Sequence, residues 1–335
     1  MRTLLTSLFL GLLVGCMDQT ALPDQEQDVE ARFPVLSKDV VADKNNEEPN
    51  FQDPVDLRQR GNGFFAIGDY EQAVAYYSAS LDAKEDAKTY FNRGVAHMSK
   101  NDLDKALADY SKAAELEPKE AAPLINRGLL LNRMGKAALG IGDLTEALKL
   151  DAKDPSIPLN RGLLYLGLNM FDRALGDVDK AIELESKYAE AYINRGYCRH
   201  RMKQYSAAVQ DSDAALKLDP QNVLAYSNRG NSYTQLGEYE KALADLDAAI
   251  RMESKDAQLY NNRGSAHGAK GDHAKAAADF TRAIELAPEF ASAYRNRGLA
   301  YHTLNDREKA RADFTTSLKL EPNVNDGIPR EYLTK

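Results

Sequence analysis

Small, apolar and polar positions along most of this chain recur every 34 residues. Within one repeat, positions 4, 8 and 11 form one triplet and positions 20, 24 and 27 form a second, and most of these residues are small, apolar or aromatic. Steps of three and four residues place each triplet on one face of an α-helix. Each repeat therefore predicts two amphipathic helices. Because helices of about a dozen residues are marginal alone in water, we expect them to stack on their neighbours.

The most regular part of the pattern is the tripeptide Asn-Arg-Gly. Its seven copies are always 34 residues apart and stand at 92–94, 126–128, 160–162, 194–196, 228–230, 262–264 and 296–298. The tripeptide's glycine is position 8, and position 20 is alanine in most repeats, so the two helices of a repeat can approach closely. A strict period of this length predicts an all-α solenoid of stacked helix pairs.

The pattern resembles the tetratricopeptide repeat, which has a bulky residue at position 4, Gly or Ala at 8, an aromatic residue at 11, alanine at 20 and 27, and often proline at 32. Seven units fit at 34 residues each from residue 87, and an earlier unit over 54–86 fits with one residue fewer. The resemblance implies eight antiparallel helix pairs over residues 54–324, wound into a right-handed superhelix. Residues 325–335 are expected to form a short C-terminal tail.

Residues 1–15 have the pattern of a secretory signal peptide, with Arg2 followed by an apolar run that is too short to span a bilayer. Residues 13–16 resemble the bacterial lipobox, which implies cleavage before Cys16 and lipidation of that cysteine; the alternative is an ordinary signal with a chance cysteine. Met17 follows Cys16, and by the sorting rule of such lipoproteins this favours the outer membrane over the inner. We therefore expect a membrane anchor through lipid only, in a bacterial cell envelope.

Charge separates the N-terminal segment from the repeats. Residues 16–53 are acidic and contain three prolines without helical or strand periodicity, which predicts a disordered tether. Of the 43 basic and 51 acidic residues in the chain, 39 and 41 lie in residues 54–335. Such a nearly neutral array has no electrostatic footprint for nucleic acid, so we expect no nucleic-acid partner.

Arginine at position 7 and aspartate at position 23 recur in step. Together they favour a forked ion pair between the two helices of each repeat, because an unpaired carboxylate beside the core would be costly. The alternative is a row of free arginines for an anionic partner. The arginines are Arg93, Arg127, Arg161, Arg195, Arg229, Arg263 and Arg297, and the aspartates are Asp109, Asp143, Asp177, Asp211, Asp245, Asp279 and Asp313.

Resemblance to the family implies a concave groove lined by positions 2, 5, 6, 9, 12 and 13 of each first helix. Asparagine at position 6 can donate to and accept from a peptide backbone, or instead bond to a neighbouring repeat. Positions 5, 9 and 12 are apolar in repeats two to five and polar in repeats six to eight, which indicates an exposed apolar strip unless repeat curvature buries it. The groove candidates are Phe91, Asn92, Val95, Ile125, Asn126, Leu129, Leu159, Asn160, Leu163, Ile193, Asn194, Tyr197 and Asn228.

The sequence contains no nucleophile–base arrangement, phosphate loop or paired-cysteine metal motif, so we expect neither an enzyme nor a bound cofactor or metal. The function that these features favour is a lipid-anchored scaffold that binds a protein or peptide segment at a bacterial envelope. The alternatives are a regulatory subunit of an envelope enzyme complex, such as a peptidoglycan hydrolase, and a ligand or metal binder. Self-association through the last repeat is a further hypothesis, because residues 323–335 are too short for a capping helix.

Overall fold

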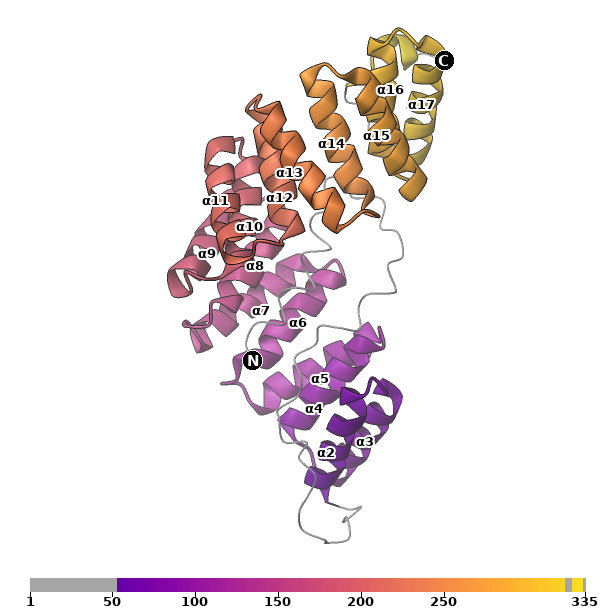
Figure 1. Cartoon of the computed structure of the whole chain (residues 1–335). Helices are drawn as coiled ribbons and strands as arrows, with labels where there is room; N and C mark the ends of the chain where they lie inside the picture. The colour runs from indigo at the N-terminus through magenta and orange to yellow at the C-terminus, as the bar shows by residue number, and fades with distance from the viewer. Residues whose placement is uncertain (1–52, 323–326, 334–335) are drawn as a thin grey trace. The chain divides into compact units, whose positions relative to one another are not determined.

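The computed structural model describes residues 53–322 and 327–333 (Figure 1). These residues contain sixteen α-helices and no strand, which confirms the predicted all-α fold of eight helix pairs. The signal peptide, Cys16 and nearly all of the expected tether lie outside the described residues. Among the helices that are described, none combines the length and the apolar character needed to cross a bilayer.

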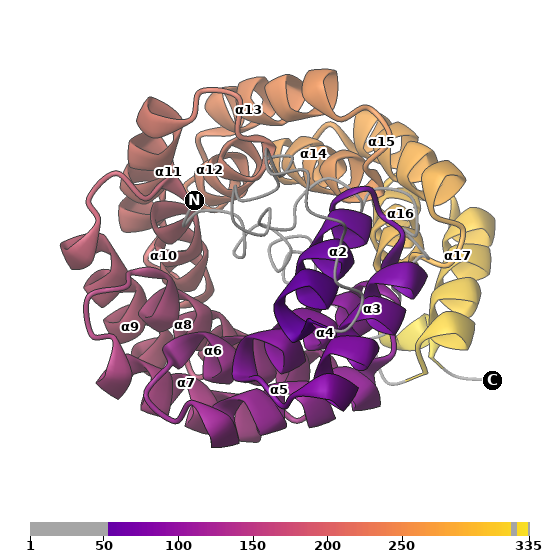
Figure 2. The same ribbon diagram turned by 90° about the horizontal axis from the view of Figure 1, so that it is seen from below.

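The helices fall into two compact units, and the first unit ends at Glu185. In unit 1 the first helices of the pairs lie in one layer and the second helices in another (Figure 2). Each first helix packs against the second helix of its own repeat and, after the first repeat, also against the second helix of the preceding repeat. Unit 1 holds α2 (Pro54–Ala66), α3 (Tyr70–Ala83), α4 (Ala87–Ser99), α5 (Leu103–Leu116), α6 (Ala121–Arg133), α7 (Ala137–Leu150), α8 (Ser156–Gly167) and α9 (Phe171–Leu184).

Unit 2 begins at Ser186 and repeats the same two-layer arrangement. Its first helices also contact one another, α10 with α12, α12 with α14 and α14 with α16. It holds α10 (Ala189–Arg201), α11 (Tyr205–Leu218), α12 (Val223–Gln235), α13 (Tyr239–Met252), α14 (Ala257–Lys270), α15 (His273–Leu286), α16 (Ala291–Thr303), α17 (Arg307–Leu320) and the short 3₁₀ helix η2 (Arg330–Tyr332).

The turn inside each helix pair is set by position 15 of the repeat, which has a left-handed backbone in all eight repeats. Glycine adopts this conformation without a steric cost and asparagine adopts it more readily than most residues, so the first helix ends there. Lys203 is the one exception in residue type, with φ of 61°. The eight residues are Gly68, Asn101, Gly135, Asn169, Lys203, Gly237, Gly271 and Asn305.

Close approach within a pair depends on the glycine at position 8. A Cβ atom on Gly298 would lie 2.7 Å from Cε1 of Phe314, which is fully buried. In the third repeat position 20 is also glycine, and a Cβ on Gly140 would collide with the carbonyl oxygen of Gly128. The backbones of α6 and α7 therefore approach more closely than an alanine at either position would allow.

The C-terminal tail covers the apolar end of the last repeat. Ile328 and Tyr332 are buried against Ala310 and Phe314, and the rings of Phe314 and Tyr332 lie 4.9 Å apart. Leu333, the next residue along the tail, is 39% exposed. Phe314 is therefore covered by the tail and offers no exposed apolar surface for self-association through this end.

Candidate functional site

All seven of the expected arginine–aspartate pairs are present. In each pair the arginine Nε and Nη2 atoms donate to the aspartate carboxylate over 2.6–2.9 Å. The aspartate side chains are only 3–13% exposed. At Asp211 both bonds reach one oxygen, and Arg199 donates to the other. These hydrogen bonds raise the pKa of Arg229 and Arg263 above the ordinary arginine value. The arginines thus join the two helices of a repeat and do not form a row of free cations.

The same arginines also connect successive repeats, which sequence reasoning missed. The Nη1 atom donates to a side chain on the second helix of the preceding repeat, over 2.6–3.2 Å. One guanidinium therefore holds three helices together. The acceptors are Ser78, Ser111, Thr145, Asp213, Asp247 and Thr281, for Arg93, Arg127, Arg161, Arg229, Arg263 and Arg297 respectively.

The position-6 asparagines divide between the two roles that the sequence left open. Three donate to the preceding repeat: Asn92 to Asn62, Asn262 to Ser227, and Asn296 to Asn261, over 2.9–3.1 Å. Asn194 donates to the carbonyl oxygen of Glu190 in its own helix.

The remaining position-6 asparagines differ in exposure. Asn160 is fully buried, and neither polar atom of its side chain has a hydrogen-bond partner among the described residues. Asn126 and Asn228 are each 9% exposed. Of these three, Asn228 lies beside a hollow in unit 2.

The structure corrects the expectation of an exposed apolar strip. Phe91 and Val95 are half-buried and pack against the cluster that contains Tyr110 and Leu130. The other aliphatic groove candidates are at most 8% exposed, so they are core residues and give a partner almost no surface. They are Ile125, Leu129, Leu159, Leu163 and Ile193.

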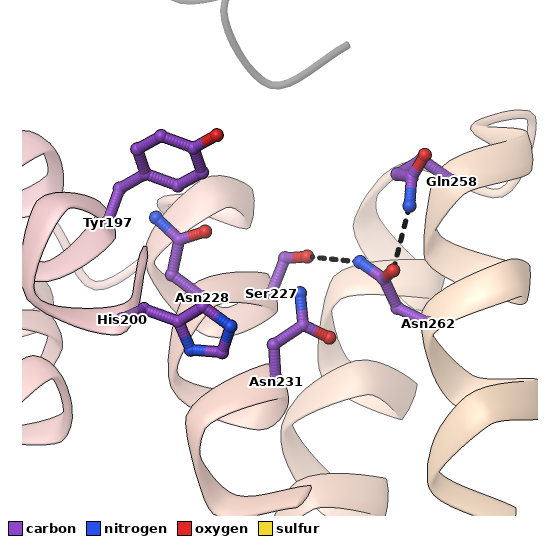
Figure 3. A pocket seen from close by; sticks show the side chains of 7 residues that line it. All are labelled: Tyr197, His200, Ser227, Asn228, Asn231, Gln258 and Asn262. Carbon is purple, nitrogen blue, oxygen red and sulfur yellow. Dashed lines mark hydrogen bonds between the residues drawn. The ribbon is translucent and has the colours of Figure 1, made fainter. Parts of the chain in front are cut away.

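A polar hollow lies on the first-helix face of unit 2 (Figure 3). Its cavity volume is about 20 Å³, so the lining side chains form a slight depression that is partly open to solvent. Helix α10 contributes two side chains, α12 three and α14 two, and all of them occupy repeat positions 2, 5, 6, 9 or 12. The lining residues are Tyr197, His200, Ser227, Asn228, Asn231, Gln258 and Asn262.

Part of this lining is held in place by internal hydrogen bonds. Gln258 Nε2 donates to Asn262 Oδ1 over 2.8 Å, and Asn262 Nδ2 donates to Ser227 Oγ over 3.1 Å (Figure 3). The side-chain amides of Asn228 and Asn231 make no such bond within the described residues. Each of these two amides therefore has a donor and an acceptor to offer a ligand.

The protonation of His200 follows from its neighbours. Ser232 Oγ donates to the carbonyl oxygen of Asn228 over 2.8 Å, so its one proton is used. His200 Nδ1 lies 3.0 Å from Ser232 Oγ and must therefore donate to this hydroxyl oxygen. The neutral imidazole of His200 accordingly carries its proton on Nδ1. Burial, and secondarily the charge of Arg201, lower the pKa of His200. The seven lining side chains are thus uncharged at neutral pH.

Five lining residues were not among the groove candidates predicted from the sequence: His200, Ser227, Asn231, Gln258 and Asn262. They occupy positions 12, 5, 9, 2 and 6, which the resemblance assigns to the groove, so the register of the repeats contained the signal. Tyr197 and Asn228 were both candidates, and the structure brings them to the same hollow. No group of three or more histidine, cysteine or acidic side chains in the described ranges could hold a metal ion.

The fold defines a protein built of stacked helix pairs, with a small polar hollow on the first helices of unit 2. Models of the tetratricopeptide repeat match residues 87–120, 257–290 and 291–324, and a further model of the TPR repeat matches 199–237 and 230–271. The chain therefore contains tetratricopeptide repeats, and these repeats support a scaffold for protein–protein interaction.

Solved structures agree with this assignment. A tetratricopeptide repeat protein from Parabacteroides merdae is similar with a TM-score of 0.63 and 25% identity, over 74% of this chain and 97% of that one. A chain of the APC/C hetero-tetramer Cut9–Hcn1 has a TM-score of 0.61 over 80% of this chain and 53% of its own. At 14% identity, that likeness shows the fold alone.

Curated relatives match only short stretches. The photosystem I assembly protein Ycf3 of Prochlorococcus marinus is 40% identical over 74 residues, which are 21% of this chain and 43% of the relative. Protein unc-45 homolog B of Xenopus tropicalis is 34% identical over 89 residues, 25% of this chain and 10% of the relative. The chain thus spans less than half the length of these relatives.

Proposed function

We propose that this protein is a lipid-anchored scaffold of a bacterial envelope that binds an extended peptide segment of its partner in the hollow of unit 2. The observation that carries the proposal is the pair of unbonded amides at Asn228 and Asn231, fixed beside a bonded row of polar side chains. An extended peptide presents backbone donors and acceptors in alternation, and a side-chain amide satisfies both kinds of group.

The absence of charge in the lining indicates what is recognised. With His200 neutral, none of the seven side chains would attract a charged residue of the ligand. Recognition would rest on the peptide backbone and on contact with the ring of Tyr197, which is half-buried at the edge of the hollow (Figure 3). Binding should therefore depend little on salt, since ionic strength screens charge pairs and leaves neutral hydrogen bonds almost unaffected.

The test begins with peptides selected from a displayed library of random sequences. Binding of a selected peptide is measured for the native protein and for the double variant Asn228→Ala/Asn231→Ala. We expect at least a tenfold loss of affinity, because two hydrogen bonds worth about 0.5–1.5 kcal/mol each are removed. Asn132→Ala is the matched control, since Asn132 occupies the groove position 12 on α6 of unit 1. Unchanged affinity in the double variant would contradict the proposal.

The envelope location is part of the proposal and rests on residues 1–16. A signal-like run that ends in Leu13-Val14-Gly15-Cys16 supports cleavage and lipid attachment at the cysteine. Cells given a labelled fatty acid should incorporate the label into the native protein and not into Cys16→Ser, and only the native protein should sediment with membranes. Native protein that carries no fatty-acid label and remains in the soluble fraction would refute the lipid anchor. That result would leave the proposal of peptide binding in the hollow untested by this experiment and open to the binding assay above.

A further inference from the structure

The tyrosine at position 4 forms a stacking contact with arginine in five repeats, and the first, third and fourth repeats have Leu57, Leu124 and Pro158 at this position. In five repeats the guanidinium carbon of the position-7 arginine lies 5.3–5.6 Å from the centre of this tyrosine's ring. A cation above an aromatic face at this distance is attracted to the ring. The tyrosines are Tyr90, Tyr192, Tyr226, Tyr260 and Tyr294, one turn of helix before Arg93, Arg195, Arg229, Arg263 and Arg297.

The ring is the common feature of these contacts, and the phenol group is not. The hydroxyls of Tyr192 and Tyr260 donate to backbone carbonyls six residues earlier, and Tyr90 donates to Glu85. No such hydrogen bond accompanies the rings of Tyr226 and Tyr294 within the described residues. The arginine site is therefore complementary to an aromatic face, with or without a hydroxyl.

The third repeat has leucine in place of this tyrosine. Leu124 occupies position 4 on α6, and no aromatic ring of the described residues lies over Arg127. Three hydrogen bonds fix the edge of the Arg127 guanidinium: Nε and Nη2 donate to the Asp143 carboxylate over 2.7 and 2.8 Å, and Nη1 donates to Ser111 Oγ over 3.2 Å. Its planar faces make no comparable contact. The Asp143 side chain is 13% exposed, the largest value among the seven paired aspartates, as expected where a covering ring is missing.

A hollow is present at this place. Its cavity volume is about 430 Å³, and it is lined by residues of α5, α6 and α7 and widely open to solvent. Leu124, Ala114, Pro118 and the 40%-exposed Leu150 give it apolar walls, and Arg127 lies among them. The ion pair of Lys149 with Glu146, 2.6 Å apart, stands at its edge. The fourth repeat also lacks the tyrosine, but Pro158 is itself buried there.

We propose that this hollow is a second docking site, which takes an aromatic side chain of a bound protein against the face of Arg127. The incoming ring would make the contact that the protein's own tyrosine makes in five other repeats. This site lies in unit 1 and involves the second helices α5 and α7, so it is separate from the peptide hollow on α10, α12 and α14. Its occupant is a phenylalanine or tyrosine side chain, because the sister repeats define the chemistry that fits.

The test uses N-acetylphenylalaninamide as the probe and the side-chain Nε–H signal of Arg127 as the readout. That proton is held by Asp143, so its NMR signal should be resolved. We expect a saturable upfield shift with the native full-length protein. Leu124→Tyr should weaken binding at least tenfold while keeping the fold, because it supplies the ring that the sister repeats contain. Tyr226→Leu should create a comparable response at Arg229, which the native protein lacks.

Other outcomes would overturn the proposal. No saturable shift at Arg127, or equal binding to Leu124→Tyr, would show that the hollow holds no ring. Equal binding of the cyclohexylalanine analogue would show a merely apolar hollow without recognition of the aromatic face. Residues 16–53 contain two phenylalanines, Phe33 and Phe51. Binding of the probe that appears only in the double variant Phe33→Ala/Phe51→Ala would identify this segment of the chain as the occupant, in place of a partner.

Discussion

Replacing Asp245 with alanine tests the contact that repeats along the chain. Asp245 is 7% exposed, and its carboxylate accepts two hydrogen bonds from Arg229, both 2.7 Å long. Breaking a buried pair by removing one partner costs about 3–5 kcal/mol. Arg229 retains 20% side-chain exposure and its 2.6 Å bond to Asp213, which reduces the expected loss to about 2–3 kcal/mol.

The assay is urea unfolding followed by far-ultraviolet circular dichroism. Asp213→Ala is the matched control, because it removes the other carboxylate of the same arginine. The Asp213 side chain is 43% exposed, so its loss should cost about 0–1 kcal/mol. A stack of repeats can unfold in more than one step, so the slope of the transition must be compared among the proteins before free energies are assigned.

A double-variant cycle identifies the interaction itself. Arg229→Met together with Asp245→Ala should cost less than the sum of the two single changes, since each removes the same pair of hydrogen bonds. If Asp245→Ala lost no more stability than Asp213→Ala, the conclusion that this pair stabilises the repeat would be refuted.

Four further substitutions test the packing, the half-buried His200 and the tail. Gly298→Ala should destabilise the protein by about 1–3 kcal/mol, because the new Cβ would lie 2.7 Å from Phe314. Gly142→Ala, at a mid-helix position with open space around it, should stabilise the protein by about 0.5–1 kcal/mol. The urea midpoints of the two variants should therefore shift in opposite directions. His200 has a lowered pKa in the folded state, so the unfolded chain binds more protons below about pH 6.5, and stability should fall as pH drops through that range. His200→Gln should flatten this decline in unfolding titrations from pH 7.5 to 5, and an unchanged slope would contradict it. Tyr332→Ala uncovers Phe314 and should cost about 2–4 kcal/mol and promote association in sedimentation velocity; a variant as stable and as monodisperse as the native chain would show that the tail has no covering role.

The helix pairs could be predicted from the sequence because their pattern is local. A strict 34-residue period fixes which residues share a helix face, and each repeat supplies the same information again. The pairing of Arg229 with Asp245 followed in the same way, since both residues recur in step. The second contact of the arginine did not follow, because its acceptor varies among serine, threonine and aspartate, as in Ser111, Thr145 and Asp213.

The position of the candidate site was predicted less well, for a physical reason. Periodicity identifies the residues that face the groove, but it does not show how closely neighbouring first helices approach. Leu129 and Leu163 face the groove in register and are nevertheless only 4% and 1% exposed. The polar residues at the same positions in unit 2, such as Asn231, line the hollow instead. Burial depends on side-chain packing between repeats, which a single sequence does not contain.

The central claim is that the hollow on α10, α12 and α14 holds a peptide segment of a protein partner. Its most direct test places the photo-crosslinking residue p-benzoylphenylalanine at Asn231 in the native cell, with Asn132 on unit 1 and Lys241 on the second helix α13 as comparison positions. The cross-linked peptide is then mapped by mass spectrometry. We predict a single contiguous partner segment from position 231 and none from the comparison positions. Adducts from position 132 or 241 with none from 231 would contradict the claim.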